Sequence, residues 1–105
     1  MNNPIVINST DYWVKIVEML QQNWALIEYI QNSKYKVYFI SDDSTVFDEI
    51  YFDSYEEAEK GLRRNGFEKY KDEKRLHTFL IPPKSPFREG KHPNGPIYSS
   101  GKYWR

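Results

Sequence analysis

The carboxylates of this chain of 105 residues are concentrated in one short stretch. No lysine or arginine occurs between Lys36 and Lys60, yet this interval holds eight acidic residues, Asp53 among them. A run of single-sign charge creates a potential that attracts a partner of the opposite sign. We therefore expect a basic protein partner. The predicted partner-binding surface comprises the other seven acidic residues: Asp42, Asp43, Asp48, Glu49, Glu56, Glu57 and Glu59.

The acidic stretch does not have the spacing of a metal site. Asp42 and Asp43, followed by Asp48, lack the Asp-x-Asp-x-Asp-Gly pattern of a calcium-binding loop. The chain also has no cysteine, which excludes disulfides, thiolate metal sites and cysteine nucleophiles. We therefore expect neither a metal nor a cofactor.

The opposite charge dominates the second half of the chain. Residues 60–105 contain twelve basic and four acidic residues, a balance of +8, whereas residues 1–59 contain three basic and eleven acidic residues, a balance of −8. Basic side chains neutralise phosphates, and aromatic rings stack on unpaired bases. An RNA-binding protein or a small RNase toxin is therefore one alternative, with His92 as general acid or base. The predicted nucleic-acid site comprises Arg88, Lys91, His92 and Tyr98.

The two charged halves also allow a further alternative, in which the protein associates with itself. The acidic half of one copy would pair with the basic half of another, and such contacts close into rings or continue as filaments. The sequence therefore predicts either a monomer or a weak homo-oligomer.

Two helices are predicted from the pattern of apolar and capping residues. Trp13, Ile16, Val17 and Leu20 recur at i, i+3, i+4 and i+7, which predicts an amphipathic helix from residue 11 to residue 23. A second helix is predicted to begin at the capping box of residues 54–57 and to end in a Schellman motif at residues 65–67.

Three runs rich in β-branched and aromatic residues lie between the two predicted helices. They span residues 24–30, 35–40 and 45–52, and the turn residues between them predict an antiparallel meander. A short strand is expected near residues 67–70, and a final strand is expected over residues 76–81, with His77 half-buried in it.

The resulting order is α-β-β-β-α-β-(β). It predicts an α+β fold in which two helices pack on an antiparallel sheet of four or five strands, with both sheet faces covered. Residues 1–81 form this predicted domain. Residues 82–105 are rich in proline, glycine and aromatic residues, so we expect an irregular segment docked on the same domain.

The sequence also bears on location. No run approaches the ~20 apolar residues of a membrane span. The N-terminus has no basic region and only a three-residue apolar stretch, so it does not match a secretion signal. We therefore expect a cytoplasmic protein with no membrane association.

The chain resembles the small immunity proteins that are encoded beside bacterial contact-dependent or polymorphic toxins. The resemblance covers about residues 10–81 and rests on a cysteine-free α+β domain, an acidic stretch at residues 42–59 and a helix that begins at Ser54 after a β-meander. It implies a non-enzymatic inhibitor that binds one cognate toxin domain, often a basic nuclease, and blocks its active site. Immunity proteins share no common motif, so no site residue is transferred from the resemblance.

Overall fold

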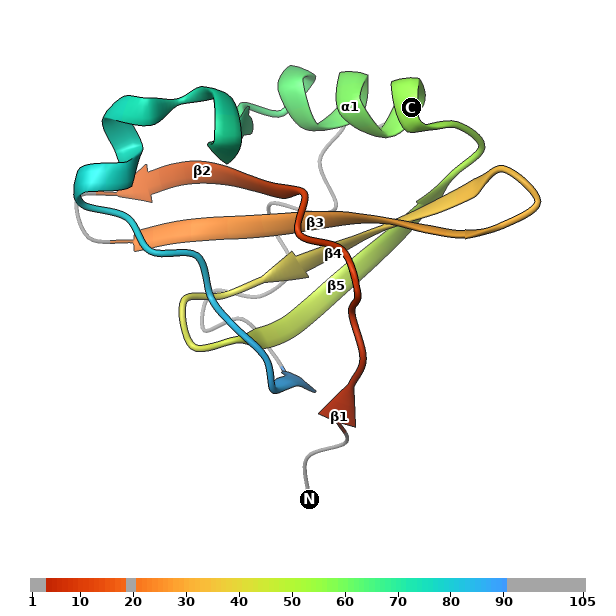
Figure 1. The fold of residues 1–105 in the computed structure, drawn as a ribbon, viewed down its shortest axis with the longest axis horizontal. Helices are drawn as coiled ribbons and strands as arrows, with labels where there is room; N and C mark the ends of the chain where they lie inside the picture. The colour runs from red at the N-terminus through yellow and green to blue at the C-terminus, as the bar shows by residue number, and fades with distance from the viewer. Residues whose placement is uncertain (1–3, 19–20, 91–105) are drawn as a thin grey trace.

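The computed structural model describes residues 4–18 and 21–90, which form a seven-stranded mixed sheet in the order β1-β7-β5-β4-β3-β2-β6 (Figure 1). The strands are β1 Pro4–Ile5, β2 Tyr12–Glu18, β3 Gln21–Gln31, β4 Lys34–Ile40, β5 Thr45–Phe52, β6 Glu68–Lys69 and β7 Phe87–Glu89. The one α-helix among the described residues is α1, Tyr55–Arg64, and two 3₁₀ helices follow it, η1 Tyr70–Asp72 and η2 Lys74–Thr78.

The central meander and helix α1 confirm the predictions made for them. Strands β3, β4 and β5 pair antiparallel in chain order. The Ser54 side chain accepts a 3.1 Å hydrogen bond from the Glu57 amide at the start of α1. At the other end, Gly66 has φ +92°, and the Phe67 amide donates a 2.9 Å bond to the Leu62 carbonyl, as a Schellman motif requires.

The prediction of a first helix over residues 11–23 is wrong, because Tyr12–Glu18 is strand β2 and strand β3 begins at Gln21. Trp13 and Val14 point to opposite faces of the sheet, and both are buried, at 0% and 2% exposure. A strand that is covered on both faces loses its alternation, and its apolar residues can then match helical spacing. The aromatic and β-branched residues of this segment favour a strand.

The predicted fold class is therefore wrong in the number of helices, the number of strands and their direction. Residues 74–78, where the final strand was expected to begin, form η2, and His77 is exposed on it rather than half-buried in a sheet. The sheet is mixed because β7 pairs parallel with the start of β5 and antiparallel with β1. Each of these pairings involves only two residues per strand and joins segments that are far apart in sequence. The local sequence pattern therefore could not predict them.

Both faces of the sheet are covered, as expected. Helix α1 covers one face, and the N-terminal segment and the stretch after η2 cross the other (Figure 1). Leu76 of η2 belongs to the buried cluster on this second face. The buried cluster under α1 comprises Trp13, Ala25, Ile27, Val37, Phe39, Phe52, Ala58, Leu62 and Phe67. The cluster on the opposite face comprises Val14, Trp24, Leu26, Tyr38, Ile40, Val46, Leu76, Leu80 and Phe87.

Residues 82–90 pack on the domain. The Pro83 carbonyl accepts a 2.5 Å bond from the Tyr12 hydroxyl, and the Gly90 amide donates a 3.0 Å bond to the Val46 carbonyl. The remainder of the predicted docked segment, residues 91–105, lies outside the described residues. Within the described ranges, no helix has the length and apolar character needed to cross a membrane.

Candidate functional site

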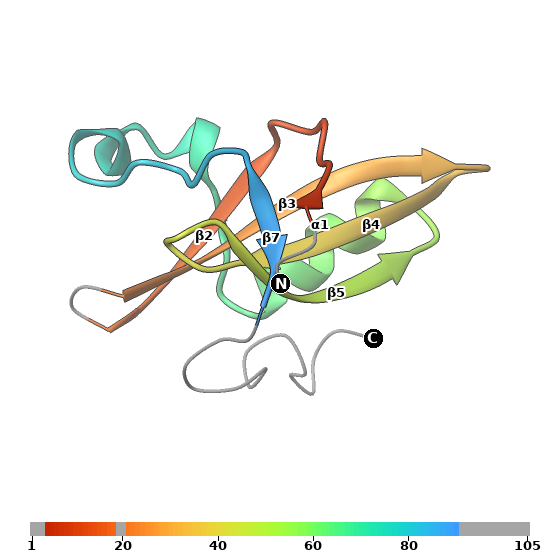
Figure 2. The same cartoon turned by 90° about the horizontal axis from the view of Figure 1, so that it is seen from below.

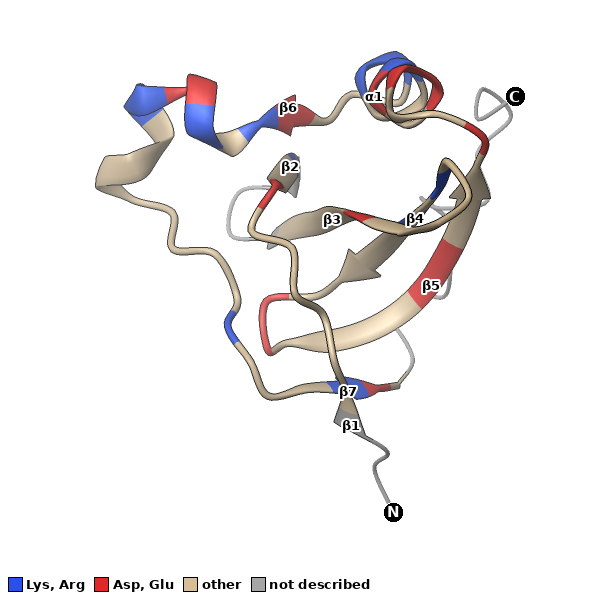
Figure 3. Cartoon of the chain, turned by 45° about the vertical axis from the view of Figure 1, so that its right-hand side comes forward, with Lys and Arg blue, Asp and Glu red and all other residues tan. Residues whose placement is uncertain are grey.

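The seven predicted partner-binding residues lie on three consecutive elements. Asp42 and Asp43 form the β4–β5 turn, Asp48 and Glu49 lie on β5, and the three glutamates lie on α1 (Figure 3). Strand β5 leads directly into α1, so the seven residues follow one another along the chain from the turn to the helix. Asp48 pairs across the sheet with Phe39 and Glu49 with Tyr38, so these two side chains point to opposite faces. We call this set of seven residues the acidic ridge.

Asp43 has a structural role at the lower end of the acidic ridge. Its carboxylate accepts bonds from the Ser41 hydroxyl at 2.5 Å and the Thr45 amide at 3.2 Å, and lies 3.7 Å from the Arg88 guanidinium. The hydrogen bonds from Ser41 and Thr45 lower the pKa of the Asp43 carboxyl. This side chain therefore holds the turn closed and joins it to β7.

Glu49, in the middle of the ridge, is partly neutralised by Lys36. The Lys36 ammonium lies 3.1 Å from the Glu49 carboxylate and sits over the rings of Tyr38 and Tyr51, 4.8 and 5.2 Å from their centroids. Burial acts to lower the pKa of Lys36, but its bonds to Glu49 and Tyr51 outweigh burial and raise the pKa. The charge of Glu49 is therefore balanced within the protein.

The upper end of the ridge, which is the part on α1, carries the negative charge that is least compensated by neighbouring basic residues. Glu59 lies 3.6 Å from Arg63 on the next turn of α1, whereas Glu56 and Glu57 are exposed and make no ion pair with any residue in the described ranges. Both lie in the first turn of α1, where the helix dipole favours carboxylates. Glu56 and Glu57 are therefore the ridge residues best placed to meet a basic partner.

Aromatic side chains extend this end of the ridge onto the β3–β4 hairpin. The rings of Tyr29, Tyr35 and Tyr55 contact edge to face in sequence, with centroids 5.3 and 5.8 Å apart. Tyr29 is 57% exposed and its neighbour Ile30 is 38% exposed. We call Tyr29, Ile30, Glu56 and Glu57 the hairpin–helix end. Sequence reasoning missed both hairpin residues, because nothing in the strand pattern shows that the tip extends beyond the covered part of the sheet.

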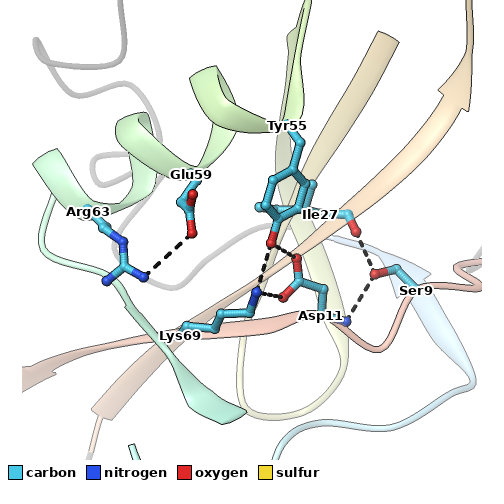
Figure 4. A network of polar contacts seen from close by, with 7 residues as sticks. All are labelled: Ser9, Asp11, Ile27, Tyr55, Glu59, Arg63 and Lys69. Carbon is cyan, nitrogen blue, oxygen red and sulfur yellow. Dashed lines mark hydrogen bonds and ion pairs between the residues drawn. The ribbon is translucent and has the colours of Figure 1, made fainter. Parts of the chain in front are cut away.

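A polar network fixes the start of α1 (Figure 4). The Tyr55 hydroxyl donates a 2.7 Å bond to the Asp11 carboxylate and accepts a 3.0 Å bond from the Lys69 ammonium, which lies 3.6 Å from the other Asp11 oxygen. The Asp11 amide donates to the Ser9 hydroxyl, which in turn donates to the Ile27 carbonyl. The network therefore joins the N-terminal segment, strand β3, helix α1 and strand β6.

The surroundings of this network shift the pKa values of two of its members. The hydrogen bond to Tyr55 raises the pKa of Lys69, and burial raises the pKa of Tyr55. Asp11, Tyr55 and Lys69 therefore hold α1 in place, and with it the adjacent Glu56 and Glu57.

A pocket of about 240 Å³ lies beside the middle of the ridge. Asp48 and Glu49 contribute to it from β5, and Glu89 from β7 adds a third carboxylate. Sequence reasoning missed Glu89 because it lies in the basic half of the chain. The described residues nevertheless contain no group of three histidine, aspartate or glutamate side chains arranged to hold a metal ion.

The predicted nucleic-acid site is described only in part. Arg88 lies on β7 with its guanidinium directed to Asp43, so its charge faces a carboxylate. Lys91, His92 and Tyr98 lie outside the described residues, and their assignment stays a prediction.

Comparison of the chain with protein-family profiles, with curated proteins and with solved structures finds no match. The geometry of its surfaces is therefore the basis for a functional assignment.

Proposed function

We propose that the protein is a non-enzymatic binding protein that neutralises a basic protein partner through its acidic ridge. Because the chain resembles bacterial immunity proteins, we propose a toxin nuclease domain as the partner. The observation that carries the proposal is the upper end of the ridge. There, Glu56 and Glu57 are exposed and make no ion pair in the described ranges. Tyr55, which precedes them, is linked through the ring of Tyr35 to the partly exposed ring of Tyr29.

The proposed mechanism has two stages. At long range, the ridge attracts a positively charged surface and raises the rate of encounter, an effect that salt weakens because the Debye length at physiological ionic strength is only about 8 Å. At short range, Tyr29 and Ile30 provide contact area that excludes water. Tyrosine is a frequent anchor in protein interfaces. The edge-to-face contact with Tyr35, which itself contacts Tyr55, positions the Tyr29 ring before binding.

Affinity capture from the native cell lysate tests this proposal. The tagged protein is incubated with lysate at low salt, with and without nuclease, and the retained material is identified. The proposal predicts one basic protein that is retained after nuclease treatment and released by high salt. Retention of RNA, with every protein lost after nuclease treatment, would instead support the nucleic-acid alternative.

A further inference from the structure

A second candidate interaction surface lies on the opposite side of the molecule from the hairpin–helix end. Phe79 and Ile81 follow η2 and are 63% and 78% exposed, whereas Leu80 between them is 5% exposed. With Leu80 in the core, its two neighbours present large apolar side chains to solvent. The exposed apolar surface of these two side chains is therefore available for contact with a partner.

Positive charge accompanies these two apolar side chains. Lys71 on η1 and Lys74 on η2 are exposed and form no ion pair within the described part of the chain, while Arg75 is paired with Glu68 and Glu73. Residues 68–84 contain five basic and three acidic side chains, a balance of +2. We call Lys71, Lys74, Phe79 and Ile81 the basic end.

The two ends are complementary in charge and alike in apolar content. Figures 1 and 2 place the η1–η2 segment on one side of the molecule and the tip of the β3–β4 hairpin on the other. Each end pairs two partly exposed large apolar side chains with two exposed charges, lysines at the basic end and glutamates at the hairpin–helix end.

We propose that copies of this chain associate end to end, with the basic end of one copy on the hairpin–helix end of the next. Phe79 and Ile81 pack against Tyr29 and Ile30, and the two lysines face Glu56 and Glu57. Two identical ends would bring like charges together, so the contact is heterologous and builds rings or open chains. A few side chains on each surface make a small interface, which places the association in the weak, transient class.

This inference needs only the chain itself and does not rest on the proposed function. The two are nevertheless connected, because Glu56 and Glu57 belong to both surfaces. A second copy bound at the hairpin–helix end covers the upper part of the acidic ridge and competes there with a basic partner.

Sedimentation equilibrium over a range of protein concentrations, at low and at high salt, tests the inference. One variant, Phe79→Ala with Ile81→Ala, removes the apolar part of the basic end. A second, Tyr29→Ala with Ile30→Ala, removes that of the hairpin–helix end. The average mass of the wild type rises with concentration, more at low salt, and each double variant raises the dissociation constant about tenfold or more. Val6→Ala is the matched control, because Val6 is 76% exposed and belongs to neither end. It behaves as the wild type.

Mixing the two double variants gives the sharpest result. Each retains one intact end, so the mixture forms dimers with about the wild-type affinity, whereas each variant alone associates at least about tenfold more weakly. A wild type that stays monomeric at every concentration overturns the proposal. So does a double variant that associates as the wild type does, or a mixture that forms no dimer while the wild type associates.

Charge exchange provides a second test that leaves the apolar side chains in place. Lys74→Glu and Glu57→Lys each weaken association alone, and the chain that carries both regains association because one charge is reversed at each end and the two reversed charges again attract. If the double exchange associates no better than either single variant, the assigned pairing of the two ends is wrong.

Discussion

Replacement of Tyr55 by phenylalanine tests the network that holds the start of α1. The change removes one hydroxyl and keeps the ring, together with its edge-to-face contact to Tyr35 at 5.8 Å. Two hydrogen bonds are lost with the hydroxyl: the 2.7 Å bond that it donates to the Asp11 carboxylate and the 3.0 Å bond that it accepts from the Lys69 ammonium. A hydrogen bond to a charged group contributes about 1.5–3 kcal/mol.

The expected loss lies at the lower end of that range. Asp11 and Lys69 are partly exposed and already lie 3.6 Å apart, so water and their mutual attraction compensate for part of each lost bond. We expect Tyr55→Phe to lower the free energy of unfolding by about 1.5 kcal/mol. For a domain of this size, the melting temperature then falls by about 6–12 °C.

Urea unfolding followed by circular dichroism measures this difference. Tyr29→Phe is the matched control, because the Tyr29 ring is exposed and no hydrogen bond involves its hydroxyl in the described part of the structure. Its expected effect is below about 0.5 kcal/mol. Equal stabilities of the two variants would refute the assignment of Asp11, Tyr55 and Lys69 as the anchor of α1.

The same network predicts a loss of stability at alkaline pH. The folded-state pKa values of Tyr55 and Lys69 are both raised, so the folded protein retains protons that the unfolded chain has already released. Their contribution is complete below the unfolded values and is lost as pH rises above about 10. The unfolding free energy should therefore fall less between a pH below about 10 and a pH above it in Tyr55→Phe than in the wild type.

Three further changes test the elements that carry the acidic ridge. Ser54→Ala removes the cap that bonds the Glu57 amide, and thermal unfolding should show a loss of about 1 kcal/mol. Gly90→Ala would place a methyl group 2.4 Å from the Thr45 Cγ2 atom, so hydrogen exchange should show weaker protection of β7 than in the wild type. Unchanged protection would contradict the close packing at this position. Because the pKa of Asp43 is lowered, its contribution is present above the unfolded value of about 4 and is lost as pH falls through the lower folded value. Asp43→Asn should therefore flatten the acid limb of the stability profile, and an unaltered acid limb would contradict this role.

Local patterns in the sequence were sufficient for the meander and for α1. The turns between the β-type runs and the Ser54 cap act within a few residues, so the chain itself displays them. Strand β2 was missed because Trp13 and Val14 are buried on opposite faces, which removes the alternation that marks a strand. Strand β7 was missed because its pairing with β5 joins residues more than forty positions apart, as in Thr45 with Arg88.

The candidate site was predictable in composition but not in arrangement. The acidic run is visible in the sequence, whereas the local compensation of Asp43 by Arg88 and of Glu49 by Lys36 depends on contacts between strands. The exposure of Tyr29 depends on how far the hairpin extends beyond the rest of the sheet. These contacts move the centre of the proposed surface from the whole acidic run to the start of α1.

The association rate of the captured basic partner with charge variants tests the central claim most directly. Each carboxylate attracts a unit charge about 10 Å away by roughly 0.4 kcal/mol in water. Glu56→Gln combined with Glu57→Gln should therefore slow association about fourfold at low salt. Asp72→Asn, on the far side of the molecule, serves as the control and should leave the rate close to that of the wild type. Equal rates for the wild type and the double glutamine variant would contradict binding through the acidic ridge.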